Sequence, residues 1–355
     1  MKKLLSLLLP ATLLLSGCTW LPAPREMGDM ALLRTMGVDT GEEGVTLTVS
    51  TGPRARGLQG EQQPALKLSA RQPSLSAAAL NIQGLSDSFV FFGYVDQLLL
   101  GEALARESVA PVLDWFARDV ELGLGAQMWI IRDTTAQKAV ESGGDRGVEE
   151  RLTTLRTDGR LGIAAVPRTA GEVYADILEL GSAYVPALIL GEGEDAALTG
   201  GGYAVLKGDA LAGFLTGEQV QGLELLAGKP SANVLAGRLG DAPASVRVYR
   251  SATTSRFGQD GRLKLSCRIW ARLAEYDRQP DEEELEGLRE QIQQQEEIRI
   301  RSVLGQLREW EADCLSLGAK AGLTSPGQWK EFQEGWPGRF GRLEPELTVR
   351  VELVR

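Results

Sequence analysis

The sequence has no histidine among its 355 residues and only three cysteines. Without histidine there is no Ser-His or Cys-His nucleophilic pair, no HExxH zinc site and no imidazole pH switch. Two of the cysteines, Cys267 and Cys314, lie on the apolar side of a predicted strand and a predicted helix, which favours buried free thiols over a disulfide between them. The sequence has no CxxC motif and no metal-ligand spacing, so we expect neither a metal nor another cofactor.

Two glycine motifs resemble nucleotide-binding loops, but their surroundings contradict that function. Residues 191–196 match a dinucleotide fingerprint, yet Glu192, Glu194 and Asp195 would place three negative charges against a pyrophosphate. Residues 222–229 have five residues between the glycines where a phosphate loop has four. We therefore interpret the first motif as an interdomain loop and the second as the end of a helix. No carboxylate pair stands in an apolar stretch, so the sequence names no catalytic residue.

Positive charge is scarce relative to negative charge. Lys and Arg total 38 against 48 Asp and Glu, which gives a formal net charge of −10 and excludes nucleic acid as a general partner. Hydrophobic residues make up 43% of the chain, which is typical of a globular protein with a real core. The length indicates two or three domains.

The N-terminus has the pattern of a bacterial lipoprotein. Lys2 and Lys3 precede an apolar run over 4–15, and 12 residues reach only about 18 Å as a helix, short of a bilayer core of about 30 Å. The run ends in Leu-Ser-Gly-Cys, which resembles a lipobox. We expect residues 1–17 to be a signal peptide and Cys18 to carry a diacylglyceryl anchor; the alternative is an ordinary secretory signal with a chance cysteine.

Strands and helices alternate along the chain, which predicts an α+β (mixed α/β) fold. The predicted strands cover 45–49, 66–68, 89–95, 126–131, 185–190, a hairpin over 200–215 with Gly208 in its turn, 245–251, 262–273 and 346–354. The predicted helices cover 25–35, 74–82, 101–118 with a kink or a new start at Pro111, 134–141, 148–155, 171–180, 216–227 capped by Thr216, 281–317 and a short one after Pro326. We expect the long amphipathic helix over 281–317 to pack on the chain's own sheet, with a partner-binding coiled coil as the alternative.

The segment from Gly202 to Lys229 reads GYAVLKGDALAGFLTGEQVQGLELLAGK. It resembles the hairpin motif G-x-A-V-F-K-x-D-x-L-x-G-x-L and the helix after it in the Ger(x)C spore germination lipoproteins, the C subunits of nutrient germinant receptors. The matching motif residues are Gly202, Ala204, Val205, Lys207, Asp209, Leu211, Gly213, Leu215, Glu218, Gly222, Gly228 and Lys229. Cys18 with nearby Trp20, residues 82–119 and the closing stretch after Trp336 agree in order. Trp20 stands one place later than usual, Leu206 replaces the usual phenylalanine, and 335–341 is rich in glycine.

The resemblance implies a non-enzymatic, lipid-anchored subunit on the outer face of the inner spore membrane. It would assemble with A-type and B-type integral-membrane subunits in a complex that senses amino acids or sugars. The implied fold has three small sheet-and-helix domains, which we place at 18–122, 123–197 and 198–355. We interpret the motif glycines and apolar residues as scaffold, and leave docking open for Lys207, Glu218 and Lys229.

Two other functions are compatible with parts of the sequence. A solute-binding lipoprotein of an ABC importer fits the length, the anchor and the α/β content, and it predicts two similar lobes that close on a solute. A secreted hydrolase would need a Ser-Lys or carboxylate mechanism, and no motif supports one.

Overall fold

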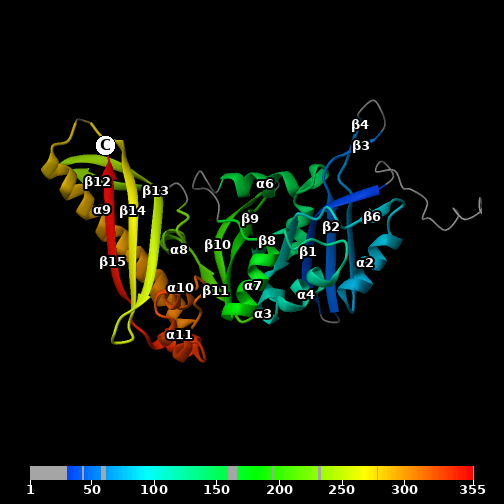
Figure 1. The fold of residues 1–355 in the computed structure, drawn as a ribbon. Coiled ribbons are helices and arrows are strands. Elements are labelled where there is room, and N and C mark those ends of the chain that lie inside the picture. The colour runs from blue at the N-terminus through cyan, green and yellow to red at the C-terminus, as the bar shows by residue number, and fades with distance from the viewer. Residues whose placement is uncertain are drawn as a thin grey trace, which may run out of the picture.

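The computed structural model describes residues 30–41, 44–56, 61–158, 166–193, 196–230, 233–277 and 279–354. The predicted signal peptide 1–17, Cys18 and Trp20 lie outside these residues. The described chain forms a nine-stranded sheet covered by helices and a four-stranded sheet beside it that packs on a long helix (Figure 1). This arrangement confirms the predicted α+β class. No helix in the described ranges is both long and apolar enough to cross a membrane.

The nine-stranded sheet has the order β11-β10-β9-β8-β7-β1-β2-β5, and β6 pairs with β1. The strands are β1 (Met30–Gly41), β2 (Gly44–Thr51), β5 (Lys67–Gln72), β6 (Phe89–Phe91), β7 (Gln97–Gly101), β8 (Gln127–Arg132), β9 (Ser182–Leu190), β10 (Leu198–Lys207) and β11 (Ala210–Leu215). The central pairs β1–β7, β7–β8 and β8–β9 and the short β1–β6 pair are parallel, whereas β1–β2, β2–β5, β9–β10 and β10–β11 are antiparallel. A separate two-stranded ribbon joins β3 (Arg54–Arg56) to β4 (Glu61–Gln63).

Helices cover both faces of this sheet, which explains why its central strands are mainly apolar and buried. Successive residues of β7 belong to different cores: Leu98 and Leu100 face one side and Leu99 the other. The first side is covered by α2 (Leu75–Gly84), α3 (Glu102–Glu107), α4 (Ala110–Arg118) and α7 (Ala170–Leu180). The second is covered by α5 (Ala136–Glu141) and α6 (Glu149–Asp158), with the short 3-10 turn η3 (Gly144–Arg146) between them.

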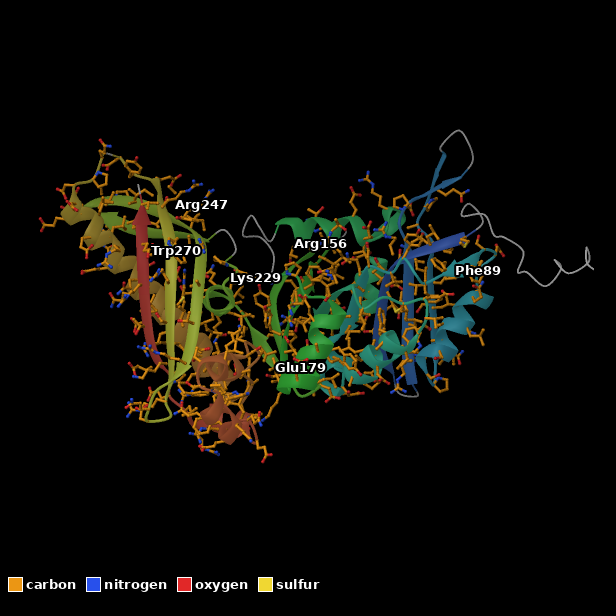
Figure 2. All side chains as sticks on the ribbon, in the orientation of Figure 1. Phe89, Arg156, Glu179, Lys229, Arg247 and Trp270 are labelled. Atoms are coloured by element: carbon orange, nitrogen blue, oxygen red, sulfur yellow. The ribbon has the colours of Figure 1, made fainter. Side chains whose placement is uncertain are left out.

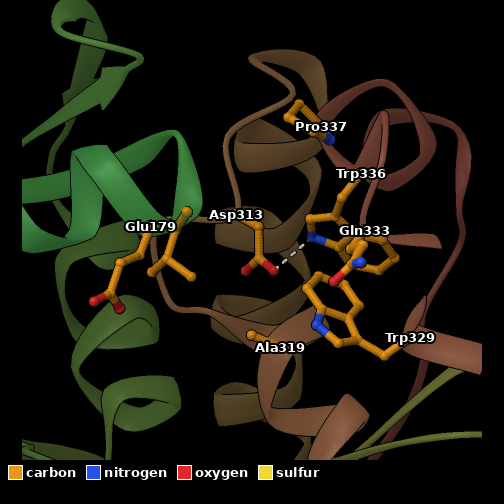
Figure 3. A pocket seen from close by; sticks show the side chains of 8 residues that line it. Glu179, Asp313, Ala319, Trp329, Gln333, Trp336 and Pro337 are labelled. Atoms are coloured by element: carbon orange, nitrogen blue, oxygen red, sulfur yellow. Dashed lines mark hydrogen bonds between the residues drawn. The ribbon is translucent and has the colours of Figure 1, made fainter. Parts of the chain in front are cut away.

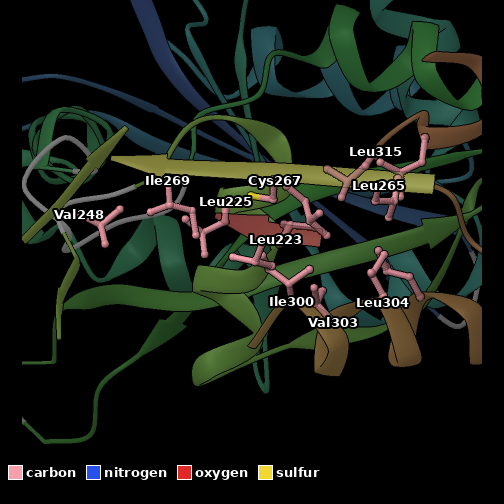
Figure 4. Packing of buried hydrophobic residues seen from close by; sticks show 14 of the residues in the cluster. Leu223, Leu225, Val248, Leu265, Cys267, Ile269, Ile300, Val303, Leu304 and Leu315 are labelled. Atoms are coloured by element: carbon pink, nitrogen blue, oxygen red, sulfur yellow. The ribbon is translucent and has the colours of Figure 1, made fainter. Parts of the chain in front are cut away.

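The four-stranded sheet has the order β12-β13-β14-β15. Its strands are β12 (Asn233–Leu239), β13 (Ala242–Phe257), β14 (Leu263–Glu275) and β15 (Glu346–Val354), and only β14–β15 is parallel. Alternate residues of β14, such as Leu265, Cys267 and Ile269, are buried against α8 (Glu218–Ala227) and α9 (Glu282–Glu309) (Figure 4). Three short helices complete this core: α10 (Leu317–Thr324), α11 (Pro326–Phe332) and α12 (Trp336–Arg342).

The hairpin of β10 and β11 joins the two cores. Ala204 and Leu206 point into the core of the nine-stranded sheet, whereas Tyr203, Val205 and Leu215 belong to the core of the four-stranded sheet. The alternation of side chains along a strand therefore lets one hairpin serve both sheets.

Most predicted elements are confirmed, including the hairpin with Gly208 at φ +60° in its turn. Pro111 lies in the first turn of α4, a separate helix that begins at Ala110, and does not kink one long helix. Cys267 and Cys314 are buried free thiols, as predicted. The packing of α9 on the chain's own sheet is confirmed by its contacts with β12 and β15.

Three predictions are wrong. The predicted helix over 25–35 is replaced, over its described part, by β1, which pairs with β2 and β7. Thr216 does not cap α8, because Gly217 takes the N-cap position. The long helix ends at Glu309, since Glu311 and Ser316 adopt positive φ, and α10 is a separate helix.

The three-domain division stays a prediction. Strands of the nine-stranded sheet come from all three predicted segments: β7 pairs with β8 across the boundary at 122, and β9 pairs with β10 across the boundary at 197.

Candidate functional site

The predicted motif forms a hairpin followed by a helix, between the two sheets. The turn between β10 and β11 lies on the junction of α3 and α4. Ser108 donates a hydrogen bond of 2.5 Å from Oγ to Oδ2 of Asp209, and the Val109 amide donates to the Asp209 carbonyl oxygen at 2.8 Å. Asp209 therefore holds the hairpin turn against the helices of the large sheet.

The apolar motif residues are buried. Ala204, Val205 and Leu215 are 0% exposed and Leu211 is 7% exposed. Each lies in one of the two cores, so the structure gives these four residues a packing environment.

The motif glycines stand where a side chain would not fit. Gly202 has φ +91°, and a Cβ there would meet the backbone oxygen of Leu215. A Cβ on Gly213 would meet the Trp310 ring, and a Cβ on Gly222 would lie 2.6 Å from the Arg299 carbonyl oxygen. Gly228 ends α8 in the left-handed conformation. These positions agree with the interpretation of the glycines as scaffold.

The charged motif residues lie on the surface and do not converge. Lys207 Nζ lies 2.7 Å from Glu311 Oε2, and Glu218 Oε1 lies 3.8 Å from Arg299. Lys229 is exposed at the end of α8 and has no ion pair with any described residue (Figure 2). The first two connect the motif to α9 and to the turn after it.

The motif contains a buried polar network that was not predicted from the sequence. The Tyr203 hydroxyl donates to Glu224 Oε1 at 2.7 Å and accepts a hydrogen bond of 2.5 Å from the Val166 amide. Burial, followed by the nearby Glu224 carboxylate, raises the pKa of Tyr203 well above its ordinary value. The available signal in the sequence was Glu224, which stands among the leucines of the stretch 223–226. A glutamate among leucines is not expected at a solvent-facing position of a helix.

Glu296 is a second buried acid that sequence analysis missed. It lies in α9, is 0% exposed and sits 3.5 Å from Arg299. Burial raises its pKa to about 7, partly offset by Arg299. The apolar stripe of the helix skips a turn between Ile292 and Ile300, with Glu296 in the gap, and that interruption was the available signal.

A pocket of about 260 Å³ separates the end of α7 from α10, α11 and α12 (Figure 3). Its walls include Glu179, Asp313, Trp329 and Trp336, and the two indole rings are 5.3 Å apart in an edge-to-face arrangement. Figure 3 shows the Asp313 carboxylate accepting a hydrogen bond from the Trp336 indole, at 2.9 Å.

The Asp313 carboxylate also accepts hydrogen bonds of 2.8 Å from the Leu317 and Gly318 amides, at the start of α10. Burial raises its pKa to about 6. Its oxygens are engaged in holding one helix and one indole ring, which is a structural role. Among the described residues no group of three acids or cysteines could hold a metal ion.

Comparison with known families identifies the chain. A model described as the spore germination protein N-terminal domain matches residues 24–188, and one described as spore germination B3/GerAC like, C-terminal, matches residues 201–355. The chain belongs to the Ger(x)C family of spore germination proteins. The hairpin motif lies at the start of the second match, so the family assigned from the motif is confirmed.

The crystal structure of the GerBC protein has the same fold as this Ger(x)C chain. The two superpose with a TM-score of 0.61 at 16% sequence identity, over 90% of this chain and 97% of the other. No curated protein matches the sequence. The Ger(x)C proteins are germinant receptor C subunits and are associated with membranes.

Proposed function

We propose that this chain is the lipid-anchored, non-enzymatic C subunit of a spore nutrient germinant receptor. The observation that carries the proposal is the pair of family matches, which follow each other over 24–188 and 201–355 and so account for both sheets. On this proposal the chain assembles with A-type and B-type integral-membrane subunits on the outer face of the inner spore membrane.

The anchor gives the proposal a physical mechanism. Two acyl chains on Cys18 would hold the chain at a bilayer stably, where one chain would give marginal binding. Confinement to the membrane raises the effective concentration of the chain near membrane partners, so modest contacts suffice for assembly. Lys207, Glu218 and Lys229 remain candidates for such contacts.

The described acids support a role without catalysis. Tyr203 donates to Glu224, Arg299 lies beside Glu296, and two amides and an indole donate to Asp313. Each of these three buried acids thus has polar partners within the fold, which fits a structural role. The importer alternative predicts two similar lobes, whereas a nine-stranded mixed sheet and a four-stranded sheet are dissimilar.

The experiment is the substitution Cys18→Ala in the full chain, expressed in spores. We expect the protein to leave the membrane fraction and nutrient-triggered germination to be lost, while the unfolding midpoint of the purified chain stays unchanged. A membrane-bound Cys18→Ala protein with normal germination would contradict the proposal. Stabilisation of the wild-type chain by amino acids or sugars in a thermal shift would favour the importer alternative.

A further inference from the structure

The outer face of the four-stranded sheet is strongly basic, although the whole chain carries a net charge of −10. The residues of β13, β14 and β15 that point away from the core include six arginines and one lysine, against three carboxylates, Glu275, Glu346 and Glu352. The cations are Arg247, Arg250, Arg256, Lys264, Arg268, Arg272 and Arg350. We call this surface the basic face.

Strand register places these cations next to one another. Arg247 pairs with Arg272, and Arg256 pairs with Lys264, between β13 and β14. Arg268 pairs with Arg350 between β14 and β15. Like charges directly opposite one another destabilise a sheet, so a cluster of this kind has a cost for the isolated chain.

The basic face is open. The inward residues of β14 are buried against α8 and α9, whereas Arg268 is 55% exposed on the outward side. In Figure 1 the helix α9 lies behind the strands of this sheet, and Figure 2 shows Arg247 and Trp270 on these strands. The described helices thus lie on the opposite face.

Part of the charge is balanced within the face. Lys264 Nζ lies 2.9 Å from Glu346 Oε2, and Arg268 lies 3.4 Å from Glu352. The guanidinium of Arg250 stacks over the Trp270 ring at 4.6 Å. Within the described parts of the chain the other four arginines of the face, Arg247, Arg256, Arg272 and Arg350, make no ion pair.

The basic face and its edges also carry aromatic and aliphatic side chains that are partly exposed. Trp270 lies at its centre, and Val234, Tyr249 and Val354 are 49% to 52% exposed beside it. Tryptophan, tyrosine and arginine are enriched at protein interfaces, and lysine is depleted there. The basic face has six arginines and one lysine. This excess of arginine fits recognition of carboxylates, because a guanidinium binds a carboxylate through two parallel hydrogen bonds.

We propose that the basic face docks an acidic, water-exposed segment of an integral-membrane subunit of the same receptor. This inference rests on the proposed function for the identity of the partner. Charge complementarity requires an acidic partner, and the composition of the face favours protein over lipid headgroups. With the neighbouring β12, the strands of the basic face are about 4.8 Å apart, and β14 and β15 pair over nine residues, so the sheet face measures about 20 Å by 30 Å, of the same order as the roughly 800 Å² per partner of a standard interface.

The test uses the full, lipidated chain with three of the arginines that make no ion pair neutralised: Arg247→Gln, Arg272→Gln and Arg350→Gln. The matched control removes three exposed cations elsewhere, on α5, α6 and α11: Lys138→Gln, Arg156→Gln and Lys330→Gln. Each protein is purified from solubilised spore membranes, and the two integral-membrane subunits that accompany it are quantified by mass spectrometry.

We expect the basic-face variant to carry at least about tenfold less of one membrane subunit than the wild type, with an unchanged unfolding midpoint, and the control to match the wild type. Salt should weaken the wild-type association and have less effect on that of the variant. Equal recovery of both membrane subunits with variant and wild type would overturn the proposal.

Two other occupants would also overturn it. Loss of binding to vesicles containing phosphatidylglycerol, with intact subunit recovery, would assign the face to lipid. A wild-type dimer that becomes a monomer in the variant would assign it to a second copy of the chain. If neither membrane subunit accompanies the wild-type chain, and spores lacking the chain germinate normally, the receptor assignment itself would be wrong. If spores lacking the chain fail to germinate, but the variant and the wild type recover both membrane subunits equally, only the docking surface would be wrong.

Discussion

A few buried acids distinguish this chain from an ordinary acidic protein, in which carboxyl groups are mostly exposed. Glu296 is fully buried in α9, and its pKa is raised to about 7, above the ordinary glutamate value of 4.5. Arg299 and Glu218 are the charged groups that influence it. Because the fold favours the neutral acid, its stabilising contribution is complete below about pH 4.5 and is lost as the pH rises through about 7.

We predict that Glu296→Gln removes this dependence on pH. The wild type should lose on the order of 2 kcal/mol of unfolding free energy relative to the variant between pH 5 and pH 8, measured by urea denaturation. Glu290→Gln, an exposed change on the same helix, is the control and should follow the wild type. Asp313 titrates in the same direction in all three proteins, so its contribution cancels. If the unfolding free energies of the wild type and of Glu296→Gln differed by the same amount at pH 5 and at pH 8, the raised pKa assigned to Glu296 would be contradicted.

For single residues, the sequence predicted which side chains are buried better than it predicted which elements surround them. Cys267 and Cys314 were correctly placed on apolar stripes, because each stripe follows from local periodicity. The environment of Glu296 depends on α8, which packs against α9 from about seventy residues earlier in the chain. A local pattern shows the interruption in the stripe but not what covers it.

At the scale of elements, α8 of the motif packs closely against α9. Gly222 allows it, since a Cβ there would lie 2.6 Å from the Arg299 carbonyl oxygen. Backbone cannot move as easily as a flexible side chain, so an added methyl group must push the two helices apart.

We predict that Gly222→Ala lowers the unfolding free energy by about 1–3 kcal/mol. Gly305→Ala, within α9 and with no atom within 4 Å of its Cβ position, should instead raise it by about 0.5–1 kcal/mol through helix propensity. Chemical denaturation of the two variants measures both effects. A stabilising Gly222→Ala would show that the helices are not in close contact.

Element types were predictable where local signals were strong. Gly228 follows the last residue of α8, as expected from the interpretation of residues 222–229 as the end of a helix. The first element of the fold was not predictable. Local propensity favours a helix there, but β1 forms a strand because it pairs with β2 and β7 in the folded chain. The end of α9 depends on positive φ at Glu311, for which the sequence offers no glycine.

At the scale of the molecule, one hairpin belongs to two cores and thereby joins the sheets. Tyr203 and Ala204 are neighbours in β10 and point into different cores. The order of nine strands could not be predicted, since the parallel pairs join segments far apart in the sequence. The motif of residues 202–229 was recognisable from sequence because its glycines and buried residues are local, and the basic face was not, because it forms only when β13, β14 and β15 pair.

The central claim is that this chain is a receptor subunit required for the response of the spore to nutrients. Germination of spores that lack the chain tests it most directly, measured as the fall in optical density after adding amino acids or sugars. The account predicts that the response to at least one nutrient is lost, that the wild-type gene restores it, and that germination by a route independent of nutrient receptors is normal. Full responses to every nutrient in the absence of the chain would contradict it.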